Sequence, residues 1–132
     1  MYKPGPVVGL PEVEYVELYN RSGVPVRIEG WQLKGGNSSK AIPAVTLQAA
    51  SCLLLAAKSD TAALSAYGAV AALPSLSLNN SSQTLSLLNG SGETVFTFTY
   101  RHEWQEAAKQ TGGWSLEMAD LAHPCIEKGN WR

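Results

Sequence analysis

Two histidines, His102 and His123, are the side chains best suited to acid–base or nucleophilic chemistry in this chain of 132 residues. A histidine activates a serine only when the two side chains lie within hydrogen-bond reach. The sequence has no Gly-x-Ser-x-Gly segment, the turn that exposes a nucleophilic serine in many hydrolases. Ser91 stands between two glycines, but its surroundings indicate a hairpin turn. We therefore interpret both histidines as surface residues near strand ends and expect no enzymatic activity.

Metal-binding patterns are equally sparse. The nearest pairs of metal-ligating residue types are His102 with Glu103 and His123 with Cys125. Neither spacing suits a tetrahedral zinc site. Three neighbouring glutamates could offer oxygens to a calcium ion, but the chain lacks an Asp-x-Asp-x-Asp-Gly loop. They are Glu12, Glu14 and Glu17. We predict no metal and no cofactor.

The two cysteines, Cys52 and Cys125, are far apart in the sequence. They lack the close spacing of a metal knuckle or a redox pair. Two interpretations stay open. They are either two buried free thiols, which are common in protein cores, or one long-range disulfide, which requires an oxidising compartment.

Aromatic and basic side chains gather in the last third of the chain. Such a combination can stack on sugar rings or on the bases of single-stranded nucleic acid. The candidate binding residues are Arg101, His102, Trp104, Trp114 and Trp131. The competing interpretation is that the tryptophans plug the ends of a core. An exposed row of all three would favour a binding surface, and burial of all three would remove its basis.

Length and charge set the broad class. We expect residues 1–132 to form a single domain. The formal net charge of −1 gives no overall attraction for nucleic acid or an anionic membrane. No run of about 18 apolar residues is present, so no membrane span is predicted. No signal peptide is visible at the start, so the signal of an exported protein would lie upstream.

The elements that must position these side chains are mostly strands. About eight short strands with turn residues between them are predicted. They cover residues 13–19, 24–28, 31–33, 42–47, 52–57, 76–78 and 114–118, with a hairpin over 84–100. One short helix is expected within 59–68, and a polar loop at 35–39. Without alternating strand–helix units, this pattern is typical of an all-β, antiparallel β-sandwich.

Several of these segments resemble a known family in their order and spacing. Residues 14–20, EYVELYN, are similar to the opening strand of a lamin tail domain. Residues 26–33 resemble its glycine–tryptophan segment, and residues 76–80 with 85–87 resemble its later pair of strands. The similarity extends from about residue 9 to residue 131. It implies an immunoglobulin-like fold, in the form found in secreted bacterial proteins.

The resemblance implies a non-enzymatic structural or interaction module of an exported or cell-surface bacterial protein, acting in adhesion, assembly or positioning. The expected location is extracellular, at the cell surface or periplasmic. The expected partners are other proteins or neighbouring domains of the same chain. The alternative is an accessory module that binds carbohydrate or nucleic acid, such as DNA, for a linked enzyme.

The chain departs from the family at its start, where members usually have a strand of the "NEI" or "NEV" type. We therefore expect a fragment of a larger protein, cut just inside the domain. A missing first strand would leave a sheet edge open for pairing with another chain, such as an edge-strand dimer.

Six residues are expected to have structural roles. Trp31 should be a core anchor between two sheets, and Gly30 should need a backbone angle that other residues disfavour. Asn20 should bond its own backbone in a turn. Either Glu14 or Glu17 should face a turn or a cation. Tyr15 completes the set, within the segment that resembles the family.

Overall fold

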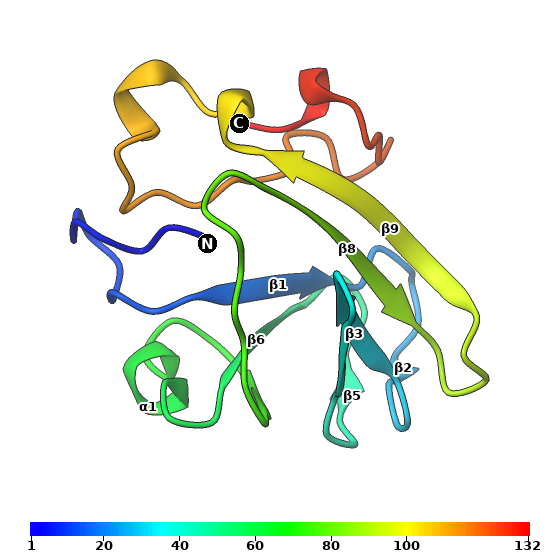
Figure 1. The fold of residues 1–132 in the computed structure, drawn as a ribbon. Helices are drawn as coiled ribbons and strands as arrows, with labels where there is room; N and C mark the ends of the chain where they lie inside the picture. Colours follow the sequence, from blue (N-terminus) through cyan, green and yellow to red (C-terminus); the bar gives the residue numbers. More distant parts are fainter.

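The apolar run Cys52–Ala57 forms β6, the central strand of the first layer in this computed structural model of residues 1–132 (Figure 1). On one side, β6 pairs with the antiparallel strand β1, Tyr15–Tyr19. On the other side, it pairs with the parallel strand β7, Val70–Leu73. Residues 53–56 are buried, which confirms the prediction of a strand covered on both faces.

The parallel pairing of β6 with β7 differs from the predicted, fully antiparallel arrangement. Val70–Leu73 contains two alanines, which are depleted in strands, so this strand has a weak sequence signal. The predicted helix is present as α1, Thr61–Leu64, and lies between β6 and β7 in the chain. A parallel pair needs such a crossover. The helix is shorter than predicted, and Asp60 at its start makes no side-chain cap hydrogen bond.

The second layer is an antiparallel sheet with the order β4-β3-β8-β9. Its strands are β3, Gln32–Gly35; β4, Ser38–Ala41; β8, Ser82–Leu88; and β9, Thr94–Arg101. The predicted hairpin is confirmed as β8 and β9. Its turn depends on Asn89, whose Oδ1 accepts hydrogen bonds from the amides of Ser91 and Glu93, both at 3.0 Å. On β9, every second side chain faces the first layer.

Three strand and loop predictions are wrong. Residues 35–39 do not form a polar loop, because β4 begins at Ser38 after a tight turn in which Gly36 has a φ of 59°. This strand is mostly exposed at a sheet edge, so its sequence needs no apolar alternation. Residues 76–78 and 114–118 form no strand, and the latter contain only an isolated bridge from Met118 to Trp131. The side chain of Glu14 bonds the amide of Leu78 in the first segment, and the side chain of Gln105 bonds the carbonyls of Trp114 and Ser115 in the second.

A small ribbon of two strands joins the layers at one end. It pairs β2, Val26–Arg27, with β5, Thr46–Leu47. Because β2 has no second partner, Pro25 lies next to an edge strand, as predicted.

The main core lies between the two layers. Its buried members are Ile28, Leu33, Ile42, Leu47, Leu53, Leu55, Ala71 and Leu73. Trp31 packs against this cluster but is only half-buried, so it lies at the margin of the core and not at its centre. The arrangement of layers confirms an immunoglobulin-like β-sandwich.

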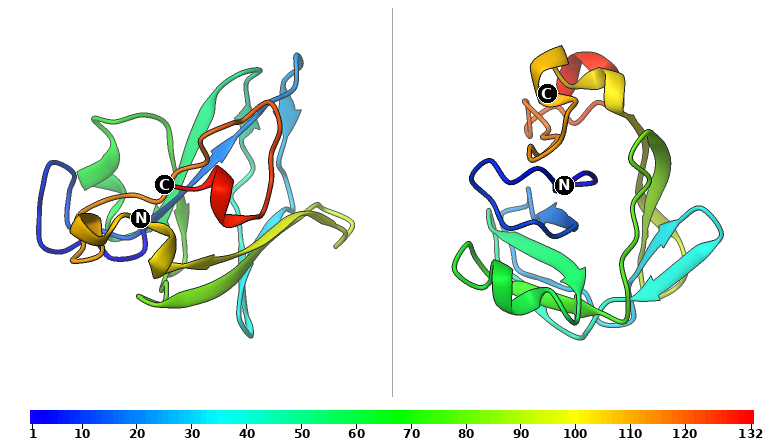
Figure 2. Two further views of the ribbon diagram at one scale, coloured as in Figure 1. Left: turned by 90° about the horizontal axis from the view of Figure 1, so that it is seen from above. Right: turned by 60° about the vertical axis from the view of Figure 1, so that its left-hand side comes forward.

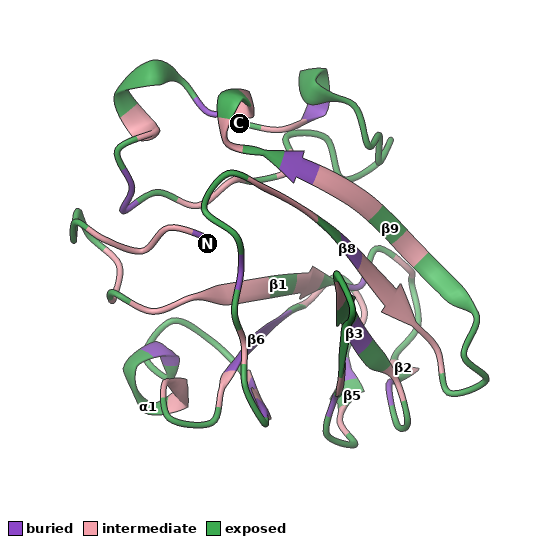
Figure 3. Ribbon diagram, viewed as in Figure 1, coloured by how far each residue is buried: buried purple, intermediate pink, exposed green.

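After β9, residues 102–132 contain three short 3-10 helices and no strand. They are η1, His102–Trp104; η2, Ala107–Lys109; and η3, Lys128–Asn130. In Figure 2, the N-terminal segment (blue) passes between the first layer and this C-terminal segment (orange and red). Residues 119–129 are all exposed, as the green colouring in Figure 3 shows for much of this segment.

Candidate binding cleft

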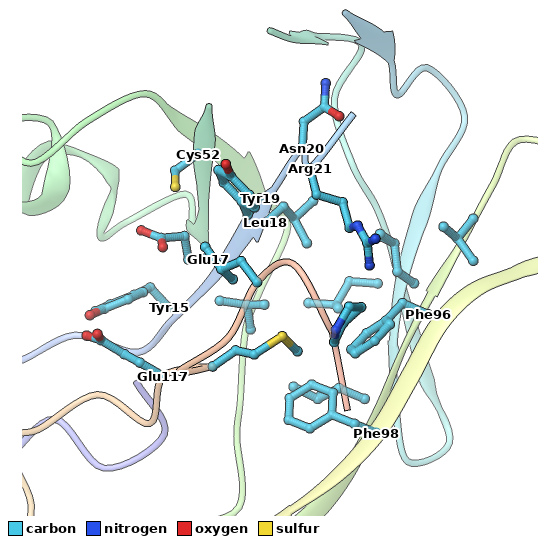
Figure 4. A pocket seen from close by; sticks show the side chains of 18 of the residues that line it. Tyr15, Glu17, Leu18, Tyr19, Asn20, Arg21, Cys52, Phe96, Phe98 and Glu117 are labelled. Atoms are coloured by element: carbon cyan, nitrogen blue, oxygen red, sulfur yellow. The ribbon is translucent and has the colours of Figure 1, made fainter. Parts of the chain in front are cut away.

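A cleft of about 700 Å³ lies where the two layers diverge (Figure 4). It is lined by 31 residues, of which 23 are hydrophobic, so its chemistry is apolar. β1 supplies one wall through Val16 and Leu18, and β9 supplies the other through Phe96 and Phe98. The alternation of side chains along each strand places these residues on the inner faces of the layers.

The roof of the cleft is the C-terminal segment. Leu116, Met118 and Trp131 line the cleft from this side. The indole Nε1 of Trp131 donates a hydrogen bond of 3.0 Å to the carbonyl of Cys125. Trp104 is tilted against Trp131, with ring centroids 6.4 Å apart. These contacts hold the roof against the end of β9.

The three tryptophans do not form an exposed row. Trp104 and Trp131 are half-buried in the roof, whereas Trp114 is 42% exposed and lies apart from them. The Lys109 ammonium lies 5.5 Å from the centre of the Trp114 ring, a cation–π contact. The predicted binding surface is therefore divided, and the two tryptophans of the roof act mainly in packing.

A buried network of hydrogen bonds joins the N-terminal segment to the C-terminal segment next to the cleft. The Tyr2 hydroxyl donates to Oε1 of Gln105 at 2.8 Å, and the Tyr2 ring stacks on Tyr100 with centroids 4.9 Å apart. Gln105 also bonds the carbonyls of Trp114 and Ser115. Burial raises the pKa of both tyrosines. The sequence analysis missed Tyr2 and Gln105. No local sequence pattern identifies side chains whose hydrogen-bond partners are distant in the chain.

Glu14 faces a backbone segment and not a cation. Its carboxylate accepts the amide hydrogen of Leu78, at 3.1 and 3.2 Å to its two oxygens. Burial raises the pKa of Glu14, and the bond from Leu78 partly offsets this shift. Partial desolvation of the Cys52 thiol, and next to it the charge of the exposed Glu17, raise the pKa of that thiol.

The N-terminal amine is buried beside β1. It donates a hydrogen bond of 2.5 Å to the carbonyl of Tyr15. Burial lowers its pKa from 8.0 to about 5, although the charges of Glu14, Glu17 and Glu117 act in the opposite direction. The side chain of Tyr15 is half-buried, and burial raises its pKa.

Asn20 directly follows β1, and its side chain bonds the backbone of two neighbouring segments. Its Nδ2 donates to the carbonyls of Val24, Leu47 and Gln48, and its Oδ1 accepts the amide of Ser22 at 3.0 Å. The expected turn bond is present, and the same side chain also ties β1 to the β5 region. Gly30 has a φ of 75°, which confirms the prediction of a backbone angle that favours glycine.

The comparison with protein families matches the lamin tail domain over residues 1–102. The chain belongs to the lamin tail domain family. This family consists of generally non-catalytic, immunoglobulin-like interaction modules. No curated protein matches the sequence. The match ends at His102, so the roof of the cleft in this lamin tail domain lies outside the matched region.

Neither histidine of the lamin tail domain is hydrogen-bonded through its ring to a serine or cysteine side chain. His123 is exposed, and its Nδ1 lies 3.0 Å from Oδ2 of Asp120, a contact that lowers the pKa of the Asp120 carboxyl. His102 lies at the end of β9, with its Nδ1 3.6 Å from Oε1 of Glu103, and the neighbouring Arg101 is exposed. No group of three or more ligating residues is close enough to hold a metal ion.

The cysteines differ from both interpretations of the sequence. Cys52 and Cys125 are free and exposed, so the disulfide is not formed, and the prediction of two buried thiols is also wrong. Cys52 begins β6 at the outer face, where strand alternation turns its side chain away from the core. No helix of the lamin tail domain is long and apolar enough to cross a membrane.

Proposed function

We propose that this lamin tail domain is a non-enzymatic interaction module of an exported or cell-surface bacterial protein, where it acts in adhesion, assembly or positioning. The observation that supports this proposal is the apolar cleft between the layers, in which 23 of the 31 lining residues are hydrophobic. An apolar cleft of this size favours contact with other polypeptide chains or neighbouring domains.

The proposed location rests on the resemblance of residues 14–20 to exported bacterial lamin tail domains. Fractionation of cells that carry the parent protein, followed by detection of this domain in surface, periplasmic and cytoplasmic fractions, tests the location. Detection in the cytoplasmic fraction alone would contradict it.

A panel of thermal unfolding measurements tests the type of partner. A ligand that binds only the folded state raises the unfolding midpoint by mass action. The panel contains polysaccharide fragments, single- and double-stranded DNA, calcium with and without chelator, and short peptides. We expect the midpoint to rise with peptides and to stay constant with the other classes.

The second candidate is an accessory module for carbohydrate or nucleic acid. The observation that favours it is the exposed Trp114 ring beside the Lys109 ammonium. A midpoint that rises with a sugar or DNA, and a rise that is lost in Trp114→Ala, would replace the interaction module with this function.

A further inference from the structure

We propose that a small hollow beside β4 is a binding site for a phosphate group. The hollow has a volume of about 120 Å³ and lies between the inner side of the sheet β4-β3-β8-β9 and the segment that joins β7 to β8. This site is separate from the apolar cleft of the proposed function, because the two spaces share only the side chains of Leu33, Leu78 and Leu85.

Three parts of the second layer and its connection form the walls of the hollow. β4 contributes Ser38 and Lys40, β8 contributes Gln83, and residues 75–78 form a further wall. In Figure 1, the chain that contains residues 75–78 (green) rises from the first layer to the start of β8. These residues belong to no strand, so no sheet uses their backbone groups. The apolar part of the lining consists of Leu33, Leu76, Leu78 and Leu85.

The polar side chains of the hollow share two properties. Each of them can donate a hydrogen bond, and none is a carboxylate. The Lys40 ammonium belongs to no ion pair, and no hydrogen bond within the protein uses it or the three serine hydroxyls. A cation beside unpaired donors is an arrangement that binds an anion. The five side chains are those of Ser38, Lys40, Ser75, Ser77 and Gln83.

Gln83 directs its amide nitrogen toward the hollow. Its Oε1 accepts hydrogen bonds from the Asn79 amide at 3.0 Å and from the Tyr100 hydroxyl at 3.2 Å, so the oxygen end of the side chain is fixed. The Nε2 atom has no partner in the protein and is still accessible to solvent. It lies beside Gly35, where an added Cβ atom would be only 2.8 Å away from it. The missing side chain at residue 35 therefore leaves this donor open to a ligand.

The wall formed by residues 75–78 adds backbone donors. The amides of Ser75, Leu76 and Ser77 donate no hydrogen bond within the protein. The next amide, that of Leu78, donates to the carboxylate of Glu14, which does not itself line the hollow. One amide of this wall therefore already binds an oxyanion, and the three preceding amides are available for another.

Size and charge select the ligand. Pockets for drug-sized molecules have volumes of about 300–1,000 Å³, so a hollow of about 120 Å³ takes only a small group. A phosphate group presents its oxygens tetrahedrally and can meet donors on several sides, and the compact charge of a lysine is a common partner for it. A planar carboxylate is matched better by the forked guanidinium of arginine, and no arginine lines the hollow.

An NMR titration of the isotope-labelled, 132-residue chain with inorganic phosphate tests the site. Sodium chloride keeps the ionic strength constant, so that screening does not change during the titration. We expect saturable shifts, at millimolar phosphate, of the Gln83 side-chain amide and of the backbone amides of Lys40 and Ser75. Equal shifts with chloride alone, or shifts that do not saturate with phosphate, would overturn the proposal.

A pair of matched lysine variants tests the role of the cation. Lys40→Gln removes the only charge that lines the hollow, so we expect phosphate to bind at least about tenfold more weakly. Lys34→Gln removes the same charge from the neighbouring strand β3, where Lys34 is exposed and lies outside the hollow. It should change the affinity by less than about twofold. Equal losses in the two variants would show that phosphate responds only to the surface charge.

A pair of matched glycine variants tests the open space beside Gln83. The methyl group of Gly35→Ala would lie 2.8 Å from Nε2 of Gln83 and 3.2 Å from Cδ2 of Leu85, so the Gln83 amide must move. We expect a shifted Gln83 side-chain amide without phosphate and at least about fivefold weaker binding. In Gly23→Ala the methyl group meets no atom within 4 Å, so this control should bind normally.

Unchanged affinity in Gly35→Ala, with a displaced Gln83 amide, would contradict the assigned site. Ser77→Ala supplies a test that does not disturb packing, because this serine is exposed. The loss of one hydroxyl donor should weaken phosphate binding about two- to fivefold. Unchanged affinity in both Ser77→Ala and Lys40→Gln would overturn the proposal.

The phosphate can be a free ion or a phosphoserine group on a partner chain, since Ser38, Ser75 and Ser77 are exposed at the opening. The peptide acetyl-Gly-phosphoserine-Gly-amide distinguishes these sources. Binding at least about fivefold tighter than that of inorganic phosphate assigns a partner chain, and equal or weaker binding assigns the free ion. In both cases Lys40→Gln must weaken the binding. Equal shifts with the unphosphorylated peptide would overturn the proposal, whereas the apolar cleft and its proposed function would be unaffected.

Discussion

The ring of Trp131 lies flat on the ring of Phe98, with centroids 4.4 Å apart and an interplanar angle of 4°. Phe98 belongs to β9, within the region that matches the family, and Trp131 belongs to the roof outside it. This stack is therefore a main contact by which the C-terminal segment covers the cleft.

Removal of this stack should loosen the roof. Trp131→Ala loses the contact with Phe98 and the hydrogen bond to Cys125, so we expect a loss of about 1–3 kcal/mol in the free energy of unfolding. Hydrogen exchange at Glu117 and Ala119 should also become faster, because their backbone partners, Arg132 and Asn130, lie on either side of Trp131 in the chain. Urea unfolding and NMR exchange measure the two effects.

Trp114→Ala is the control for this experiment. Trp114 is 42% exposed, and its ring lies beside the Lys109 ammonium, so its loss should cost less than about 1 kcal/mol. Equal costs for the two substitutions would show that the stack on Phe98 does not hold the roof.

The buried amine predicts a dependence of stability on pH. Its pKa is lowered from 8.0 to about 5 in the folded state, so between these values the unfolded chain binds more protons than the folded chain. Stability should therefore rise as the pH increases from about 5 to 8, by up to about 4 kcal/mol from this group. Glu14 has a raised pKa and acts in the opposite direction, but at lower pH.

Urea unfolding at several pH values checks this dependence. Acetylation of the amine removes its titration, so the acetylated chain should lose most of the rise between pH 5 and 8. A rise of the same size in the acetylated chain would assign the dependence to other groups.

Glu14 should stabilise the domain by satisfying one backbone amide. Glu14→Ala leaves the amide of the buried residue Leu78 without its acceptor, so we expect a loss of about 1–3 kcal/mol. Glu14→Gln keeps an acceptor oxygen and should recover much of this stability. Similar losses in both variants would indicate that the negative charge, rather than the hydrogen bond, is what matters.

The sequence predicted individual strands best where one segment carried a strong local signal. The apolar run of β6 and the aromatic alternation of β9 were both sufficient to identify strands. By contrast, β4 depends on its pairing with β3, and the alanines of β7 depend on α1 and β6 for burial. These strands form through long-range pairing that no short window of sequence contains.

The cleft was harder to predict than the fold. The motif of residues 14–20 identified β1 and Asn20, but the cleft also depends on how residues 116–118 and Trp131 approach from the far end of the chain. Residues 114–118 were predicted to be a strand, but they form only an isolated bridge from Met118 to Trp131. The exposed cysteines were misjudged because residue type alone favours burial.

Asn20 should be among the most costly polar residues to replace. Its Nδ2 is shared by three carbonyls, of which that of Leu47 is 3.0 Å away and buried. Asn20→Ala should therefore reduce the free energy of unfolding by about 1–3 kcal/mol, as measured with urea. Asn37→Ala lies in an exposed turn and should change it by less than about 0.5 kcal/mol. A neutral Asn20→Ala would show that water replaces these bonds.

The two thiols should react without any prior reduction. Both cysteines are free and exposed, so an aromatic disulfide reagent should titrate two thiols per folded chain. The raised pKa of Cys52, caused by burial and by Glu17, lowers its thiolate fraction, so Cys52 should be the slower of the two. Cys52→Ser should remove the slow phase. Addition of a reductant should leave the unfolding midpoint unchanged, because no cross-link restrains the unfolded chain. Absence of titratable thiols, with a midpoint that falls on reduction, would instead demonstrate a Cys52–Cys125 bridge and a rearranged C-terminal segment.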